Sequence, residues 1–328
     1  MGPKRHSVSE YVSGIKRGEK RFIAQAITLI ESQRESDLQL GEAVLQQILP
    51  LTGHGTRVGI TGSPGVGKST FLDSLGMLLI QQGLKVAVLA VDPSSTVRGG
   101  SILGDKTRMS RLAVEKNAFI RPSPSRGLLG GVARKTRESL LICEAAGFDV
   151  IFVETVGVGQ SEVAVSDLVD CMIALLLPGG GDDLQGIKKG LLEVADIVAV
   201  NKADGDNIPR AKSALSDYRT ALHCMPARIE SWQPKAQLVS GLTGDGIGEL
   251  WAQVISHRQI LLDTGGLDSL RASQRRKWMW SMVQEGVSRK LKNLRKENDS
   301  LLSIESELDR SQMTAAMAAK HILKQLGL

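Results

Sequence analysis

Residues 62–69 read Gly-Ser-Pro-Gly-Val-Gly-Lys-Ser and fit the pattern GxxxxGK[ST] at every position. They follow a short apolar run and precede a stretch with helical spacing at 69–81, the context in which this pattern forms a phosphate-binding loop. Its glycines let backbone N–H groups turn inward around a β-phosphate at the positive end of the following helix. A merely glycine-rich turn would not need the Lys-Ser ending. The residues expected to bind nucleotide here are Gly62, Ser63, Pro64, Gly65, Val66, Gly67, Lys68, Ser69 and Thr70.

Two later segments are suited to reading a guanine base. Asn201-Lys202-Ala203-Asp204 directly follows the apolar run 197–200. The Asp204 carboxylate can accept from both N1–H and the 2-amino group of guanine, whereas adenine offers an acceptor at N1 and would be rejected. Ser240-Gly241-Leu242 follows the run 237–239 and is expected to contact the guanine carbonyl through backbone N–H groups. Together with the phosphate loop, these segments predict GTP and GDP as ligands.

Carboxylates follow two more apolar runs. Glu154 follows the run 150–153 and occupies the place where most GTPases of this type carry the Asp of a DxxG motif. Gly157, three residues later, is the glycine of that motif. We expect Glu154 to hold Mg²⁺ and the Gly157 N–H to bond the γ-phosphate, so that this segment acts as a switch. Asp92 ends the run 86–91. It is either a further Mg²⁺ ligand or a turn or helix-capping residue.

Two features bear on hydrolysis and signalling. Val158 stands where Ras-like enzymes carry the Gln that orients the attacking water, and Gln160 is displaced, so unassisted hydrolysis is expected to be slow. The glycine-rich segment 179–190 carries Asp182, Gln185 and Lys188. It is either a flexible loop before a helix or a further switch that passes the nucleotide state to a partner.

Six short apolar runs alternate with stretches of helical spacing, which is typical of βαβ units. The predicted fold class is α/β, a doubly wound, mostly parallel sheet of the P-loop GTPase (SIMIBI) type with helical extensions at both ends. The expected domains are a helical N-terminal extension (1–50) whose Ser7 and Glu10 form a capping box, the GTPase domain (51–262) and a helical arm (263–328). In the arm we expect a helix over 267–296, a turn near 298–300 and a last helix from Ser311. The arm either packs on its parent domain or forms a dimer. The strands are expected at 58–60, 86–91, 150–153, 172–177, 197–200 and 237–239.

Composition excludes several other classes. Aromatic residues make up only 3%, which argues against nucleic-acid modules that stack bases on Phe and Tyr, despite a net charge of +6. Cys143, Cys171 and Cys224 show no CxxC spacing, so neither a disulfide framework nor a thiolate zinc site is expected. No apolar run is long enough to span a bilayer. Glu10 and Glu19 are unlike a mitochondrial transit peptide. A soluble protein of the reducing cytoplasm is predicted.

Four segments together resemble the MeaB/ArgK family of GTPases, and the likeness covers about residues 20–262. The segments are Val88–Ser95, Gly99–Met109, Glu154–Glu162 and Asp182–Gly190.

Members of that family are GTPase chaperones of adenosylcobalamin-dependent acyl-CoA mutases, chiefly methylmalonyl-CoA mutase, and they gate cofactor delivery from an adenosyltransferase. The resemblance implies a homodimer formed through the C-terminal arm and a loop around Asp182, Gln185 and Lys188 that signals to the mutase. It also implies Mg²⁺ ligation around Ser69, Asp92, Asp105 and Glu154. The residues expected to act in hydrolysis are Lys68, Asp92, Asp105, Glu154 and Gly157.

Three alternatives stay open. A nickel-inserting GTPase shares the Glu-bearing switch, but such proteins usually need His and Cys clusters, and the five histidines here are dispersed in sequence. A kinase of an arginine or ornithine transport system would need an acceptor pocket with its own base, for which no free candidate is evident. Finally, nucleotide binding alone could matter, with hydrolysis incidental.

Overall fold

The computed structural model describes residues 5–92, 108–124, 129–155, 161–178, 187–225, 227–297 and 299–325. Contacts divide the chain into two compact units, Met1–Gln274 and Arg275–Leu328. The expected division at residues 50 and 262 stays a prediction.

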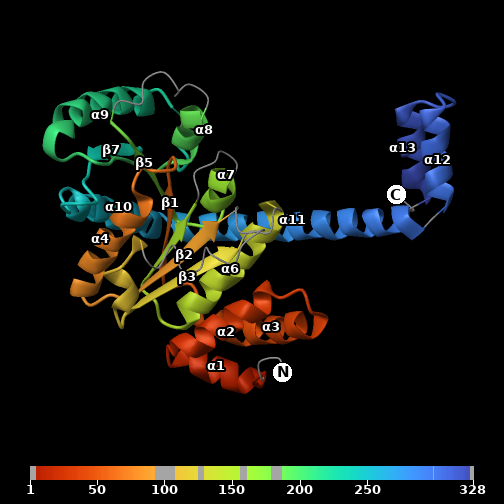
Figure 1. The fold of residues 1–328 in the computed structure, drawn as a ribbon, viewed down its shortest axis with the longest axis horizontal. Coiled ribbons are helices and arrows are strands. Elements are labelled where there is room, and N and C mark those ends of the chain that lie inside the picture. Colours follow the sequence, from red (N-terminus) through yellow and green to blue (C-terminus); the bar gives the residue numbers. More distant parts are fainter. Residues whose placement is uncertain are drawn as a thin grey trace. The chain divides into compact units, whose positions relative to one another are not determined.

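The first unit alternates strands and helices as the sequence predicts, and the second is helical (Figure 1). The strands are β1 (Thr56–Thr61), β2 (Val86–Asp92), β3 (Ala118–Pro124), β4 (Val150–Glu154), β5 (Cys171–Leu176), β6 (Ile197–Val200) and β7 (Lys235–Leu238). The helices are α1 (Val8–Lys16), α2 (Lys20–Glu31), α3 (Glu35–Ile48), α4 (Lys68–Gln81), α6 (Leu129–Ala145), α7 (Ser161–Ser166), α8 (Ile187–Val194), α9 (Ile208–His223), α10 (Ile247–Asp263), α11 (Gly266–Glu297), α12 (Asp299–Asp309) and α13 (Ala315–Gln325), with 3-10 turns at Leu49–Leu51, Leu112–Val114 and Gly205–Asn207.

All seven strands form one parallel sheet in the order β3-β2-β4-β1-β5-β6-β7. The chain winds outward from β1 to one side and then, after β4, to the other. The predicted doubly wound α/β sheet is therefore confirmed, and each of the six expected runs lies in or overlaps a strand. In such a sheet the carboxyl ends of all strands meet at one edge, where ligands bind.

Both faces of the sheet are buried, which explains why its strands are apolar almost throughout. Along β4, Val150 and Phe152 pack toward α4 and α10, while Ile151 and Val153 pack toward α2 and α6. Figure 1 shows these helix pairs on opposite sides of the sheet. Toward the β6–β7 edge, α8 and α9 cover a third cluster that includes Val198.

The N-terminal segment is helical, as expected, and its capping box is confirmed. The Ser7 hydroxyl accepts from the Glu10 N–H at 3.3 Å, and a Glu10 carboxylate oxygen accepts from the Ser7 N–H at 2.7 Å. Ile23 and Ile27 of α2 are fully buried in the cluster that α6 shares with the sheet. These helices therefore contribute to the core of the first unit.

Strand β3 is not among the strands that the sequence predicts. Pro122 and Pro124 lack the N–H that a strand in mid-sheet must donate, so the sequence of this stretch does not predict a strand. In the structure β3 is an edge strand paired only with β2, with Pro122 opposite Ala90. An edge strand needs ladder bonds on one side only, and proline is tolerated there.

The helical arm also differs from expectation. Helix α12 (Asp299–Asp309) was not predicted, and the last helix begins at Ala315 rather than at Ser311. Ser311 has a φ of 57°, a left-handed conformation that ends a helix rather than beginning one. Ile304 of α12 and Ala318 of α13 are buried against each other's helix, so the two form a small hairpin. Among the described helices none combines the length and apolarity that a membrane crossing requires.

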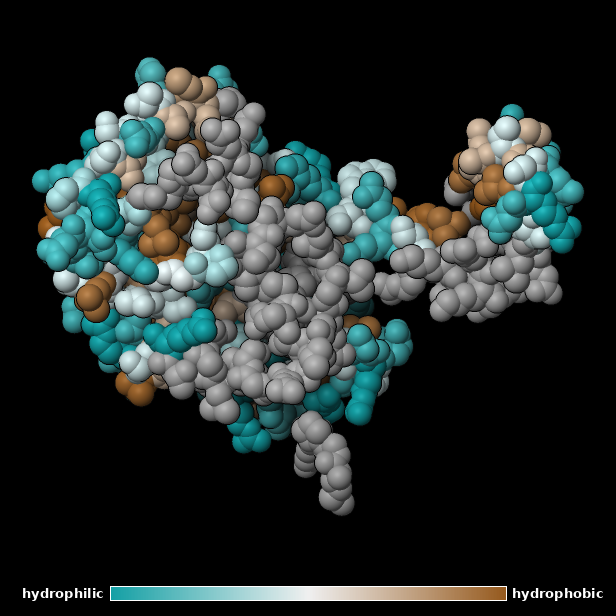
Figure 2. All heavy atoms as spheres, turned by 45° about the horizontal axis from the view of Figure 1, so that its top comes forward, coloured by the Kyte–Doolittle hydropathy of each residue, from teal (hydrophilic) through white to brown (hydrophobic). Residues whose placement is uncertain are grey.

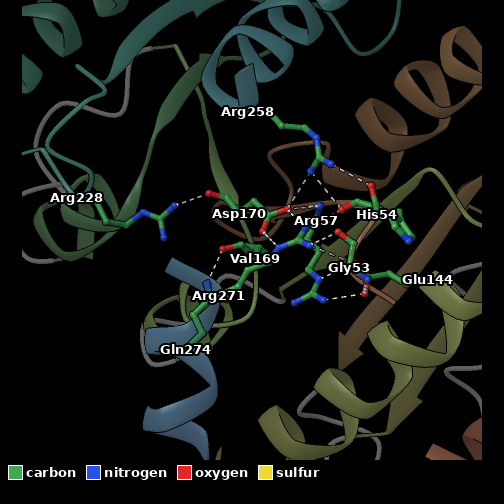
Figure 3. A network of polar contacts seen from close by, with 11 residues as sticks. Gly53, His54, Arg57, Glu144, Val169, Asp170, Arg228, Arg258, Arg271 and Gln274 are labelled. Carbon is green, nitrogen blue, oxygen red and sulfur yellow. Dashed lines mark hydrogen bonds and ion pairs between the residues drawn. The ribbon is translucent and has the colours of Figure 1, made fainter. Parts of the chain in front are cut away.

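A buried ionic network ties the first turns of α11 to the sheet (Figure 3). Arg271 donates to both Asp170 oxygens at 2.8 and 2.7 Å, and to the carbonyls of Gly53 and Gly55. Arg57 of β1 holds the Glu144 carboxylate of α6 in a second bidentate pair at 2.9 and 2.7 Å. Because β5 follows Asp170 directly, the network lies at the amino edge of the sheet, opposite the phosphate loop.

Charge pairing decides the ionisation of Asp170. Burial alone would raise the pKa of this carboxyl, but the hydrogen bonds from Arg271 and the charges of Arg271 and Arg57 outweigh it, so that its pKa lies below the usual value. A depressed carboxyl pKa contributes stability that is present above the unfolded-state value near 3.8 and is lost as the pH falls below it.

We expect Arg271→Ala to lower the free energy of unfolding by about 3–5 kcal/mol, because it removes the bidentate partner of the buried Asp170 charge. Urea denaturation at pH 7 measures this. Arg17→Ala removes an ion pair whose partners are 60% and 42% exposed and serves as the control, with an expected change within about 0.5 kcal/mol. Equal losses in the two variants would contradict a structural role for the network. The variant should also lose less stability than the wild type between pH 5 and pH 3.

Candidate functional site

The phosphate loop joins β1 to α4 at the carboxyl edge of the sheet. Helix α4 begins at Lys68, and Gly67 caps it with a φ of 97°. A Cβ on Gly67 would stand 2.9 Å from the Asn201 amide nitrogen, so both the backbone conformation and the available space require glycine here. The loop is thus shaped by its glycines as the sequence pattern predicts.

Lys68 lies across the mouth of this loop. Its side-chain nitrogen donates to the carbonyl of Gly62 at 2.7 Å and to that of Ser63 at 3.3 Å. Burial lowers the pKa of Lys68, and the nearby Glu154 and Glu162 oppose that shift. A lysine held close to its own loop in this way is positioned to bridge phosphate oxygens.

Ser69 and Glu154 meet beside Lys68. The Ser69 hydroxyl donates to a Glu154 carboxylate oxygen at 3.2 Å, although the residues are 85 apart in sequence. Glu154 ends β4 opposite Ile60 of β1, and it is 8% exposed. A hydroxyl and a carboxylate are the hard oxygen donors that Mg²⁺ prefers. The pair therefore fits the predicted metal site.

The backbone of Asp92 lies at the same edge of the sheet. Asp92 ends β2, whose Ala90 stands opposite Glu154 in the ladder, and its side chain is not among those described. The backbone of Lys188 lies in α8. The remaining predicted residues of the metal site, the switch and the water-orienting position lie outside the described residues: Asp105, Gly157, Val158, Gln160, Asp182 and Gln185.

Asn201 connects the phosphate loop to the predicted guanine-reading segment. Its side-chain nitrogen donates to the Val66 carbonyl at 2.8 Å, and its side-chain oxygen accepts from the Gly241 N–H at 3.0 Å. The residue is 2% exposed. The sequence motif predicts that Asn201 contacts the nucleotide. The link that Asn201 makes between the phosphate loop and Gly241 is visible only in the structure.

Asp204 is oriented by the same segment. The Ser240 hydroxyl donates to the Asp204 carboxylate at 2.5 Å and accepts from the Thr243 N–H at 3.1 Å. Lys202 adopts a φ of 59°, and Leu242 is 77% exposed. The structure thus brings Asn201, Asp204 and residues 240–242 together, as predicted for a guanine site.

Ser74 is a neighbour of the candidate site that no sequence motif predicts. Its hydroxyl donates to the Gly241 carbonyl at 2.7 Å. Ser74 belongs to no motif and lies at an ordinary position of α4, so the sequence carries no signal for it.

A separate cluster of possible metal ligands lies at the opposite edge of the sheet. Donor atoms of the buried Cys171, Asp196 and His257 lie within 4.8 Å of one another. The dispersed histidines of the sequence had not suggested this grouping. Asp196 already pairs with Arg228 and accepts from the Met172 N–H, so its charge is satisfied without a cation. We regard the cluster as part of the protein core.

The geometry of Asp204 predicts a change in base preference. Asp204→Asn replaces an acceptor of two guanine hydrogen bonds by an amide, and we expect GDP affinity to fall about a hundredfold or more. Affinity for xanthosine diphosphate should rise, because xanthine has a carbonyl in place of the 2-amino group. Isothermal titration calorimetry measures both. Unchanged GDP binding in this variant would contradict the assignment of Asp204.

The chain is similar to known proteins over nearly its whole length. Residues 23–296 match the family model described as methylmalonyl Co-A mutase-associated GTPase MeaB. A putative GTPase of Caulobacter vibrioides is 50% identical over 95% of both chains. A mouse protein named methylmalonic aciduria type A homolog, mitochondrial, is 42% identical over 97% of this chain and 79% of its own.

Among solved structures, a crystal structure of a protein named LAO/AO transport system kinase superposes with a TM-score of 0.79 at 38% identity, covering 98% of each chain. The family match spans both the phosphate loop and the guanine-reading segments described above. The likeness therefore includes the candidate site. This chain belongs to the MeaB family of P-loop GTPases.

Proposed function

We propose that this GTPase is a chaperone of an adenosylcobalamin-dependent acyl-CoA mutase, with methylmalonyl-CoA mutase as the first candidate. The family match carries the proposal, because the family is described by its association with that mutase. The name of the mouse relative points the same way. In this role GTP binding and hydrolysis gate cofactor loading from an adenosyltransferase and protect the mutase from inactivation.

The residues of the candidate site have distinct tasks in this proposal. Lys68 binds the β- and γ-phosphates, and the phosphate loop surrounds them with backbone N–H groups. Ser69 and Glu154, together with Asp92 and Asp105, would hold Mg²⁺, which would neutralise charge on the phosphates. Asp204 and the backbone of residues 240–242 select guanine. Gly157 senses the γ-phosphate.

Signalling to the mutase is assigned to residues 179–190, with Asp182, Gln185 and Lys188 as the polar contacts. Strand β5 ends at Leu176, at the same edge of the sheet as the candidate nucleotide site, and residues 187–190 lie in α8. With Val158 in place of a water-orienting Gln, the missing group or its ordering comes from the partner. We place this activity in the cytoplasm.

Purified methylmalonyl-CoA mutase should accelerate GTP hydrolysis by this chain about tenfold or more, since a partner that orders the transition state has effects of at least this size. Phosphate release is measured with and without the mutase, and complex formation by size-exclusion chromatography. Lys68→Ala serves as the control and should show no stimulated hydrolysis. Absence of both stimulation and complex would contradict the chaperone role and leave the GTPase assignment intact.

A transport-system kinase is the second candidate, and the name of the protein in the similar crystal structure favours it. A kinase transfers the γ-phosphate to a protein or small-molecule acceptor rather than to water. Transfer of radiolabel from GTP or ATP to a periplasmic amino-acid-binding protein would support it. Release of all label as inorganic phosphate would exclude it.

We further propose that α11 dimerises with a second copy of the chain. Met279, Val283 and Val287 stand four residues apart and therefore share one helix face, and each is 45–46% exposed. Trp280 beside them is 60% exposed. Figure 2 shows hydrophobic residues on the surface of the second unit. Such a stripe is a self-complementary surface of the kind that two-fold dimers use.

Val283→Glu should convert the dimer to a monomer, because two charges would face each other in the helix contact. Light scattering coupled to size-exclusion chromatography measures the mass. Val114→Glu changes a valine that is 82% exposed in the first unit and should leave the dimer intact. A wild-type chain that elutes as a monomer at micromolar concentration would contradict the dimer.

A further inference from the structure

The guanine-reading segment rests directly on helix α4. A Cβ on Gly241 would stand 3.0 Å from the backbone nitrogen of Phe71 and 3.1 Å from its Cα, closer than a side chain normally approaches. The Ser74 hydroxyl, one turn further along α4, donates to the Gly241 carbonyl at 2.7 Å. The helix that begins at the phosphate loop therefore also supports the base site.

Ser74 receives a hydrogen bond of its own. An Arg111 guanidinium nitrogen donates to the Ser74 hydroxyl at 2.7 Å, and another donates to Asp73 at 2.7 Å. The second oxygen of Asp73 accepts from the Leu112 N–H at 2.8 Å. Because a cation donates to the hydroxyl oxygen, the hydroxyl proton is directed away from Arg111 and toward Gly241, and that bond is strengthened.

Both sides of Gly241 are thus held by side chains from other elements. Asn201 binds its N–H, and Ser74 binds its carbonyl. We propose that Ser74 is a positioning residue for guanine recognition and that Arg111 orients its hydroxyl. The inference rests on residues 240–242 reading the base. It adds that residues 108–112 influence base binding, since Arg111 and Leu112 belong to that segment.

This arrangement separates base contacts from phosphate contacts. Ser74 touches residue 241 but makes no contact with residues 62–67 in the described hydrogen bonds of the site. Its loss should therefore weaken binding of guanine nucleotides and spare ligands that carry phosphates alone. A defect of α4 as a whole would instead weaken both, because α4 starts at Lys68.

The test measures release of a fluorescent mant-GDP from the full chain by stopped flow. We expect Ser74→Ala to release it about fivefold to tenfold faster, the effect of one lost hydrogen bond, while affinity for tripolyphosphate with Mg²⁺ stays unchanged. Ser74→Thr keeps the hydroxyl and should restore slow release. Ser216→Ala, at an exposed serine of α9, is the matched control and should behave as the wild type.

Arg111 is tested in a double-mutant cycle. Arg111→Ala should speed release by about threefold, and the double variant with Ser74→Ala should be no faster than Ser74→Ala alone, because both act through one chain of bonds.

Unchanged release in Ser74→Ala, or equal weakening of mant-GDP and tripolyphosphate, would overturn the proposal. If Ser74→Ala lowers the melting temperature markedly, Ser74→Cys, a weaker donor of similar size, replaces it. A wild-type chain that binds no mant-GDP would instead contradict the nucleotide site itself.

Discussion

Parallel alignment of all seven strands is the constraint on which the candidate site depends. Parallel strands must be joined by crossovers, so both faces of the sheet are covered by helices and all carboxyl ends share one edge. Residues that end or follow β1, β4, β6 and β7 therefore come together from separate parts of the chain. The 3.2 Å contact of Ser69 with Glu154 and the 2.5 Å contact of Ser240 with Asp204 both arise in this way.

Hydrogen bonds from side chains to backbone then unite the segments at this edge. Asn201 holds a carbonyl of the phosphate loop and an N–H of the guanine-reading segment, and it is almost fully buried. When a buried donor or acceptor loses its hydrogen bond, the folded state loses stability, because that group has been removed from water without a replacement partner. The phosphate loop and the segment predicted to read guanine are consequently joined through one buried side chain.

The opposite edge of the sheet has a different role. There, buried carboxylates are paired with arginines, as in the Asp170–Arg271 and Glu144–Arg57 pairs. Removing one partner from such a pair would be strongly unfavourable, because it would leave a buried charge unpaired. Ligands of open α/β sheets bind at the carboxyl edge, so these charge pairs lie away from the candidate site.

Much of this protein could be predicted from the sequence because its chemistry lies in contiguous motifs. The phosphate loop, the 201–204 segment and the Glu154 position each combine residue type with a preceding apolar run, and local spacing suffices to recognise them. Sheet type could be predicted for the same reason, since continuous apolar strands indicate burial on both faces. Strand β3 was not predicted, because Pro122 is acceptable only at the edge of the sheet. The position of a strand in the sheet cannot be recognised from the sequence of that strand.

Other features depended on tertiary structure alone. Ser74 finds its hydrogen-bond partner only because α4 packs against residue 241. The two bonded residues, Ser74 and Gly241, are 167 apart in sequence. The ionic network and the grouping of Cys171, Asp196 and His257 likewise join residues that no local pattern relates. The sequence by itself determined which class of ligand the chain is suited to bind, since the residues predicted to contact the ligand lie in contiguous motifs. Only the folded chain decided which side chains hold those residues in place, because such contacts form between segments whose separation in sequence says nothing of their distance in space.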